Sequence, residues 1–140
     1  MEETKIVAAV DGSDYSDLVL DKTIQYATLL NASVLLVYCH KKFPTLLGEP
    51  HRNEQIAEII SEAEELVKPY RERLDDVGIT YECRLMEEPA AAMIVDIARI
   101  EECELVVMGS RGLGNLAGLI IGSVTNQVLQ SAPCSVLVVR

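Results

Sequence analysis

The sequence predicts an α/β fold of three layers, in which an open sheet of five parallel strands lies between helices on both faces. Short apolar runs, typical of strands buried on both faces, alternate along the chain with segments whose apolar residues recur at helical spacing. The 140 residues contain no internal repeat, low-complexity segment or linker, so we expect one domain over residues 1–140.

The first strand is expected at Thr4–Asp11, where an apolar run ends in a carboxylate. Ser13 or Asp14 can cap the helix that follows, because short polar side chains accept hydrogen bonds from the first N–H groups of a helix. Apolar residues at helical spacing place that helix at Tyr15–Leu30, and Asn31 ends it.

A second buried strand is expected at Ser33–Cys39. Residues 40–53 contain two prolines and a glycine and form either a flap over a site or a plain surface loop. Apolar residues three and four apart then predict a long helix from Glu54 to Gly78, which Pro69 should kink or interrupt. Ile79–Met86 alternates apolar and polar residues, as an edge strand does.

Predicted helices and strands also alternate in the last third of the chain. Pro89 suits the first turn of a helix, which is expected at Ala90–Glu102. A fourth strand follows at Leu105–Gly109, a short helix at Ser123–Ser131 and a fifth strand at Ser135–Val139.

Composition excludes several classes of partner. The formal net charge of −10 argues against nucleic acid, which needs clustered lysine and arginine. No apolar run reaches the length of a membrane span, and the acidic N-terminus lacks the features of a secretory signal, so we expect a cytoplasmic protein that does not enter membranes. The four cysteines are widely spaced without a CxxC pair, which disfavours zinc and disulfides.

A glycine-rich stretch, VVMGSRGLGNLAGLIIGSV, follows the fourth strand and leads into the last helix. Glycines at the end of a strand let the backbone approach a bulky anion, because no Cβ stands in the way. The start of a helix offers unpaired N–H groups and a positive dipole end to the same anion. The sequence therefore predicts a phosphate-binding loop on the rim of the sheet.

Two common phosphate-binding patterns do not fit this stretch. The GxxxxGK[ST] loop needs a lysine, and no lysine occurs after Lys68. The dinucleotide-binding pattern is partly matched by Gly112, Gly114 and Gly118, but these residues follow the fourth strand and the pattern should follow the first. No acidic residue that could hold a ribose occurs after Glu104.

A third pattern consists of GxxG, nine intervening residues and then G[ST]. It matches Gly109, Gly112, Gly122 and Ser123 without a gap. With this pattern the chain resembles the universal stress protein family over essentially its whole length. The resemblance includes KIVAAVDGSDYS, SVLLVYCH, LVVMGSRG and GSVTNQVLQSAPCSVLVVR. It implies a Rossmann-like sheet of strand order 3-2-1-4-5 and a site for ATP. Because the net charge of −10 would repel ATP, the bound nucleotide needs local dipoles, a metal ion such as Mg²⁺ or Mn²⁺, or both.

The resemblance also implies roles for individual residues. The backbones of Ala9 and Cys39 contact adenine, and Asp11 accepts hydrogen bonds from the ribose or the adenine amino group, unless it only caps the first helix. Arg111 pairs with phosphate oxygens, unless it is a plain surface charge. The implied nucleotide-binding residues are Ala9, Asp11, Cys39, Gly109, Ser110, Arg111, Gly112, Gly114, Asn115, Gly122, Ser123, Val124 and Thr125. The side chains expected to pack against the body instead are Leu116, Leu119, Ile120 and Ile121.

One segment departs from the family. Glu87 and Glu88 precede Pro89 where the family commonly carries glycine shortly before the proline. Two carboxylates at this rim either repel a nucleotide or help to hold a divalent cation.

The preferred hypothesis is an ATP-binding regulatory or sensor module of the stress response, acting on an unknown protein partner with little or no hydrolysis. The reason is that the loop offers neither a phosphate-binding lysine nor a second arginine to neutralise charge during phosphoryl transfer. The alternatives are a weak or partner-stimulated ATPase and a dimeric scaffold without nucleotide. In the family's strand order Ser135–Val139 is an apolar edge strand, which predicts a homodimer joined along it.

Overall fold

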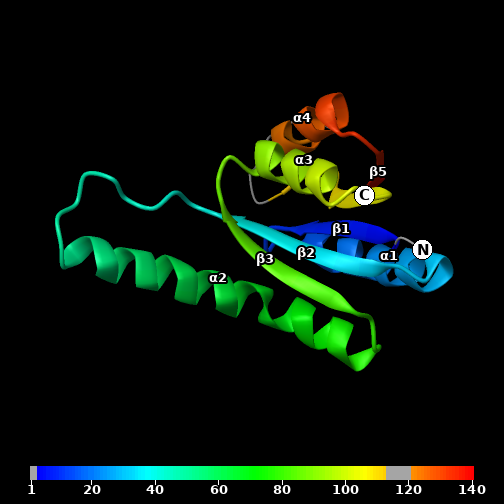
Figure 1. Cartoon of the computed structure of the whole chain (residues 1–140), viewed down its shortest axis with the longest axis horizontal. Coiled ribbons are helices and arrows are strands. Elements are labelled where there is room, and N and C mark those ends of the chain that lie inside the picture. The colour runs from blue at the N-terminus through cyan, green and yellow to red at the C-terminus, as the bar shows by residue number, and fades with distance from the viewer. Residues whose placement is uncertain (1–2, 113–120) are drawn as a thin grey trace.

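A computed structural model describes residues 3–112 and 121–140. Its strands form one parallel sheet in the order β3-β2-β1-β4-β5 (Figure 1), which confirms the predicted fold class and the strand order that the resemblance implied. The strands are β1 (Lys5–Val10), β2 (Ser33–His40), β3 (Tyr81–Glu87), β4 (Leu105–Gly109) and β5 (Ser135–Val139). The helices are α1 (Asp14–Leu30), α2 (His51–Asp76), α3 (Ala90–Ile100) and α4 (Ser123–Ser131).

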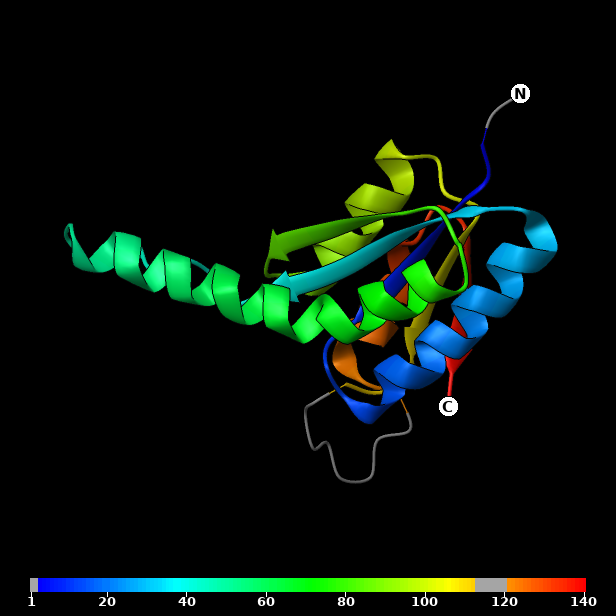
Figure 2. The same cartoon turned by 90° about the horizontal axis from the view of Figure 1, so that it is seen from below.

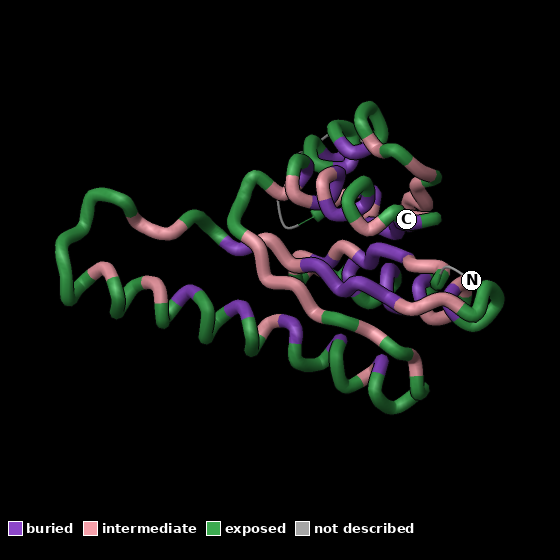
Figure 3. Tube along the Cα trace, in the orientation of Figure 1, coloured by how far each residue is buried: buried purple, intermediate pink, exposed green. Residues whose placement is uncertain are grey.

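The helices cover the sheet from two sides, α1 and α2 on one face and α3 and α4 on the other (Figure 1). Successive residues of a strand point to opposite faces, so β1 contributes to two cores. Ile6 and Ala8 pack with α1 and α2, whereas Val7 packs with α3 and α4. Figure 3 shows the burial that results along β1 and β2, and it explains why both strands read as unbroken apolar runs.

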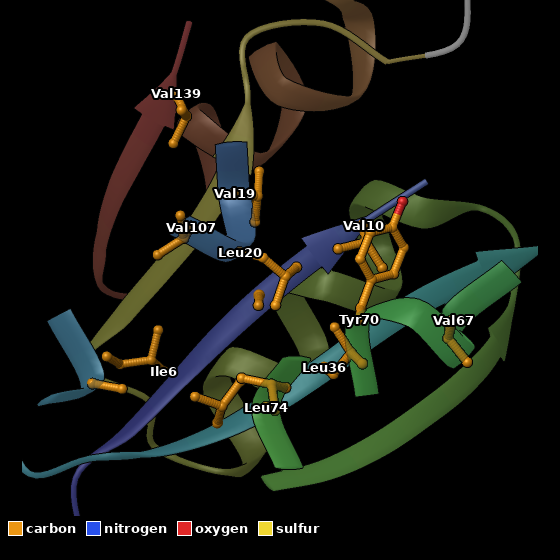
Figure 4. Close-up of a cluster of buried hydrophobic side chains, with 13 residues drawn as sticks. Ile6, Val10, Val19, Leu20, Leu36, Val67, Tyr70, Leu74, Val107 and Val139 are labelled. Atoms are coloured by element: carbon orange, nitrogen blue, oxygen red, sulfur yellow. The ribbon is translucent and has the colours of Figure 1, made fainter. Parts of the chain in front are cut away.

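The larger core includes Leu36 of β2 and joins the sheet to α1 and α2 (Figure 4). Leu20 of α1 and Leu74 of α2 belong to the same cluster, and all three side chains are fully buried. This cluster fixes α1 and α2 on the sheet and so sets the position of the loop between β1 and α1.

Helix α1 ends where the sequence predicts, but its N-terminus is capped differently from the prediction. The helix ends at Asn31, whose positive φ of 52° is the left-handed conformation that this residue type tolerates. At the other end, Ser13 occupies the cap position, but its hydroxyl makes no cap hydrogen bond. Instead the Ser13 N–H donates to Asp11 Oδ1 over 3.0 Å, so the expected capping by a Ser13 or Asp14 side chain is wrong.

Helix α2 is longer than predicted, because it begins at His51 and continues without a break through Pro69. Proline removes one helical hydrogen bond, but Val67, Tyr70 and Leu74 beside it are buried against the sheet and hold the helix in place. At 1.5 Å per residue the helix is about 39 Å long, so its first turns project beyond the sheet (Figure 2). The connection before it, residues 41–50, extends outward with these turns (Figure 1) and does not line the cavity described below.

Strand β3 lies at an edge of the sheet, and none of its residues is fully buried, as its alternating sequence predicts.

The segment before α4 differs from the expectation at Ile121. This side chain is exposed, so its expected packing against the body is wrong. The other residues expected to pack there lie outside the described residues, namely Leu116, Leu119 and Ile120. Within the described ranges, no helix is both long and apolar enough to cross a membrane.

The first prediction concerns the core around β2. Leu36 is 0% exposed, so Leu36→Ala should lower the free energy of unfolding by about 2–5 kcal/mol in urea titrations. Leu29 of α1, which is 70% exposed, provides the matched control, and Leu29→Ala should change that free energy by no more than about 0.5 kcal/mol. Equal losses in the two variants would contradict the described core.

Candidate functional site

A cavity of about 350 Å³ opens at the carboxyl ends of the strands. It lies where the chain leaves β1 toward α1 on one face of the sheet and leaves β4 toward α4 on the other. Because these two connections diverge from neighbouring strands, the rim between them is left uncovered, which is the usual place for a ligand in an open parallel sheet.

The cavity has an apolar end and a polar end. The apolar walls come from the ends of β1, β2 and β4 and from the start of α3. Their residues are Ala9, Val37, Cys39, Met108, Ala90 and Ile94. The polar end is formed by the glycine-containing loop after β4 and by the first turn of α4. Its residues are Gly109, Arg111, Gly112, Gly122, Ser123 and Thr125.

Hydrogen bonds fix the two ends of the loop after β4. Ser110 is buried, and its N–H donates to the Val139 carbonyl of β5 over 2.7 Å. The Gly122 N–H donates to the Ser110 carbonyl over 2.6 Å, and the Thr125 hydroxyl donates to the Gly109 carbonyl over 2.7 Å. These donors serve the protein itself, so the amides that α4 presents to the cavity begin at Ser123.

The first turn of α4 supplies backbone N–H groups that do not pair within the helix. The first N–H groups of a helix have no carbonyl partner within the helix, and they point out of its positive dipole end. In α4 these belong to Ser123, Val124 and Thr125, which all line the cavity. The arrangement is suited to an anion.

Two glycines of the loop are required by the packing of the protein itself. A Cβ on Gly109 would lie 2.7 Å from the Tyr15 Cβ and 2.9 Å from the Arg111 carbonyl oxygen, and a Cβ on Gly112 would collide with the Asp11 carboxylate. A Cβ on Gly122 would make an ordinary contact at 3.5 Å. Gly109 and Gly112 therefore let the loop lie close to the turn between β1 and α1.

Asp11 is fixed within that turn. Its Oδ1 atom accepts hydrogen bonds from the Ser13 N–H at 3.0 Å and from the Ser16 hydroxyl at 3.1 Å. The Ser16 oxygen in turn accepts from the N–H groups of Asp11 and Gly12. The carboxylate thus stabilises the start of α1 while it also lines the cavity, so the two roles considered for Asp11 are compatible.

Charges in the cavity are few and mixed. Arg111 supplies the positive charge of the described lining, and the described side chains form no salt bridge with it. Asp11 and Glu88 bring negative charges to the same lining. The described residues contain no group of three or more metal-ligating side chains that could hold an ion without help from a ligand.

Cys39 and Tyr38 meet the cavity at the end of β2 as neutral groups. Burial, with a contribution from the Glu88 charge, raises the pKa of the Cys39 thiol to about 11. Burial also raises the pKa of Tyr38, again with a contribution from Glu88. At neutral pH the Cys39 thiol is therefore protonated and unreactive, which leaves it the role of a small apolar wall.

The cavity brings together most of the residues that the resemblance implied. Those that line it are Ala9, Asp11, Cys39, Gly109, Arg111, Gly112, Gly122, Ser123, Val124 and Thr125. Ser110 does not line it, and Gly114 and Asn115 lie outside the described residues. Tyr15 and Tyr38 also line the cavity, and no sequence pattern predicts this, because their orientation depends on how α1 and β2 pack.

Comparisons with known proteins agree along the whole chain. The family model of the universal stress protein family matches residues 3–140. A universal stress protein of Thermus aquaticus is 34% identical over 136 residues, which are 96% of this chain and 97% of the relative. A second relative, from Methanocaldococcus jannaschii, is 32% identical and covers 97% of this chain and 81% of its own length.

Two solved structures extend the likeness to three dimensions. The structure of the hypothetical protein MJ0577, of Methanocaldococcus jannaschii, has a TM-score of 0.85 at 27% identity and covers 99% of this chain and 96% of its own. A universal stress protein in complex with cAMP has a TM-score of 0.64 at 26% identity and covers 100% of this chain and 98% of its own.

The close packing at Gly109 generates the second prediction. Gly109→Ala should lower the free energy of unfolding by about 1–3 kcal/mol, because neither the Tyr15 Cβ nor a carbonyl oxygen can swing away from the added methyl group. Gly48→Ala is the control, since a Cβ there has nothing within 4 Å, and its effect should stay within about 1 kcal/mol. Urea unfolding measures both, and an undisturbed Gly109→Ala variant would refute the described loop.

Proposed function

Because this chain belongs to the universal stress protein family, we propose that it binds an adenine nucleotide, ATP in particular, in the cavity at the carboxyl ends of β1 and β4. The observation that carries the proposal is the division of that cavity into an apolar end and an anion-suited end. A related structure was solved in complex with cAMP, which has the same two chemical halves, a base and a phosphate.

The nucleotide lies along the rim of the sheet in this proposal. Its base enters the apolar end between β2 and α3, where Cys39 and Ile94 form walls. Its phosphates reach Arg111 and the first amides of α4, starting at Ser123. The ribose lies between them, beside the fixed carboxylate of Asp11.

The bound nucleotide carries its own cation. The protein has a formal charge of −10, and one arginine cannot balance a triphosphate beside the carboxylates of Asp11 and Glu88. Mg²⁺ or Mn²⁺ coordinated mainly by phosphate oxygens and water provides the remaining positive charge. We therefore place the metal with the ligand and not in a preformed protein site.

Binding without significant turnover suits a regulatory module. Phosphoryl transfer needs a positioned water and strong neutralisation of the charge that develops on the phosphates, and one arginine with helix amides supplies little of this. In this proposal the occupied and empty cavities present different surfaces to a protein partner in the cytoplasm during the stress response. Asp11 and Gly112 belong to that surface in this proposal, because both line the cavity and lie close together.

ATP titration tests the site. In calorimetry with Mg²⁺ we expect a dissociation constant on the order of 100 μM or below, and Arg111→Ala should weaken binding about tenfold through the loss of a charge-assisted phosphate contact. Arg99→Ala removes the same charge from α3, where Arg99 pairs with Asp96 away from the cavity, and should leave binding unchanged. Phosphate release should equal the blank without protein.

Three results would count against this proposal. Absence of any ATP signal would remove the nucleotide function and favour a scaffold. Equal weakening by Arg111→Ala and Arg99→Ala would show a general charge effect without a phosphate contact. Phosphate release above the blank, lost in the Arg111 variant, would make the protein an ATPase.

We also propose that two copies pair along β5 (Ser135–Val139). This strand forms one edge of the sheet, and its three central residues are only half-buried. An apolar strand edge invites pairing with a second chain, which would cover these side chains and satisfy the free backbone groups. Sedimentation at micromolar concentration should give twice the chain mass of 15.4 kDa, and a monomer under these conditions would contradict the pairing.

A further inference from the structure

Glu88 occupies a defined place at one end of the cavity. It lies between β3 and α3, and its N–H donates to the His40 carbonyl over 2.9 Å. This bond continues the parallel pairing of Cys39 with Met86 and of His40 with Glu87. The backbone of Glu88 is thereby fixed beside the end of β2, and its side chain lines the cavity.

A second observation places the carboxylate near the apolar walls. The charge of Glu88 contributes to the raised pKa of both Cys39 and Tyr38, consecutive residues at the end of β2. The neighbouring carboxylate of Glu87 has a different environment, because its Oε2 atom accepts the Phe43 N–H at 3.2 Å and it does not line the cavity. Of the two acidic residues before Pro89, Glu88 lines the cavity and Glu87 does not.

The strand order determines which part of a nucleotide Glu88 can reach. Glu88 follows β3 and the anion-suited loop follows β4, and these strands are three positions apart in the sheet. At about 4.8 Å per strand the separation is about 14 Å along the rim. A ligand with its phosphates at Arg111 therefore places the opposite end, which is the edge of the base, near Glu88.

The chemistry of a carboxylate then determines which base fits. An ionised carboxylate only accepts hydrogen bonds, so it attracts an amino group and repels a carbonyl oxygen at the same position. We propose that Glu88 is a specificity-determining residue that accepts a hydrogen bond from the exocyclic amino group of the base and so selects adenine over hypoxanthine. This inference rests on the proposed nucleotide function. It gives the departure from the family's glycine-containing segment a role in recognition.

ATP and inosine triphosphate form the matched pair of probes, because their bases differ in carrying an amino group or a carbonyl oxygen at one position. In calorimetry with Mg²⁺, the unchanged protein should bind inosine triphosphate about tenfold more weakly than ATP, since one charge-assisted hydrogen bond is lost. Glu88→Gln should reduce this ratio to about twofold or less, because an amide can both donate and accept. Glu87→Gln is the control and should keep the tenfold ratio.

The outcomes separate this inference from the proposed function. A ratio that survives in Glu88→Gln, equal weakening of both nucleotides in that variant, or no discrimination by the unchanged protein would overturn the role of Glu88 while ATP binding stands. Absence of binding by either nucleotide would overturn the proposed function and this inference with it. Glu88 is exposed, and among the described residues its backbone N–H makes the bond that belongs to the fold. The variant should therefore unfold at the same urea concentration as the unchanged protein.

Discussion

The structure depends on the burial of β1 on both of its faces. Its alternate residues anchor helices on the two sides of the sheet, and its neighbours β2 and β4 are held in register beside it. Because the chain then leaves β1 and β4 toward opposite faces, no helix can cover the rim between them. The cavity therefore results from the way the chain leaves the two strands, and a ligand site at this rim does not require any loss of packing in the core.

The same geometry addresses the electrostatic difficulty that the proposed function raises, which is the binding of an anion by an acidic protein. The amides of α4 are partial charges fixed by the helix, so they attract a phosphate at short range whatever the net charge of −10. The Asp11 carboxylate is held by hydrogen bonds in the turn before α1, and the backbone of Glu88 is held at the end of β3 by its bond to the His40 carbonyl. Glu88 lies near the end of β2 and the amides of α4 near the end of β4, so in the proposed function these two groups act on different ends of a ligand and orient it.

Most of the fold could be predicted from the sequence because each element carries its own signal, and the bounds of β4, α4 and β5 agree to the residue. The failures occur where tertiary contacts override a local rule. Pro69 does not interrupt α2 because buried neighbours hold that helix on the sheet. The Ser13 hydroxyl does not cap α1, because the Ser16 N–H that it could accept donates to the Ser13 carbonyl instead. For the site, the pattern of glycines selected a loop whose described residues line the cavity, but the close approach of Gly109 and Gly112 is to the chain's own atoms.

Helix α2 is continuous, but only part of it is held by buried side chains. From Ile59 onward it buries a residue in nearly every turn, whereas no residue of its first two turns, 51–58, is buried. An isolated helix of that length is marginal in water, so these two turns can unwind at little cost while the rest opens only with the core. Amide hydrogen exchange along this one helix therefore spans the whole range from local fraying to global unfolding.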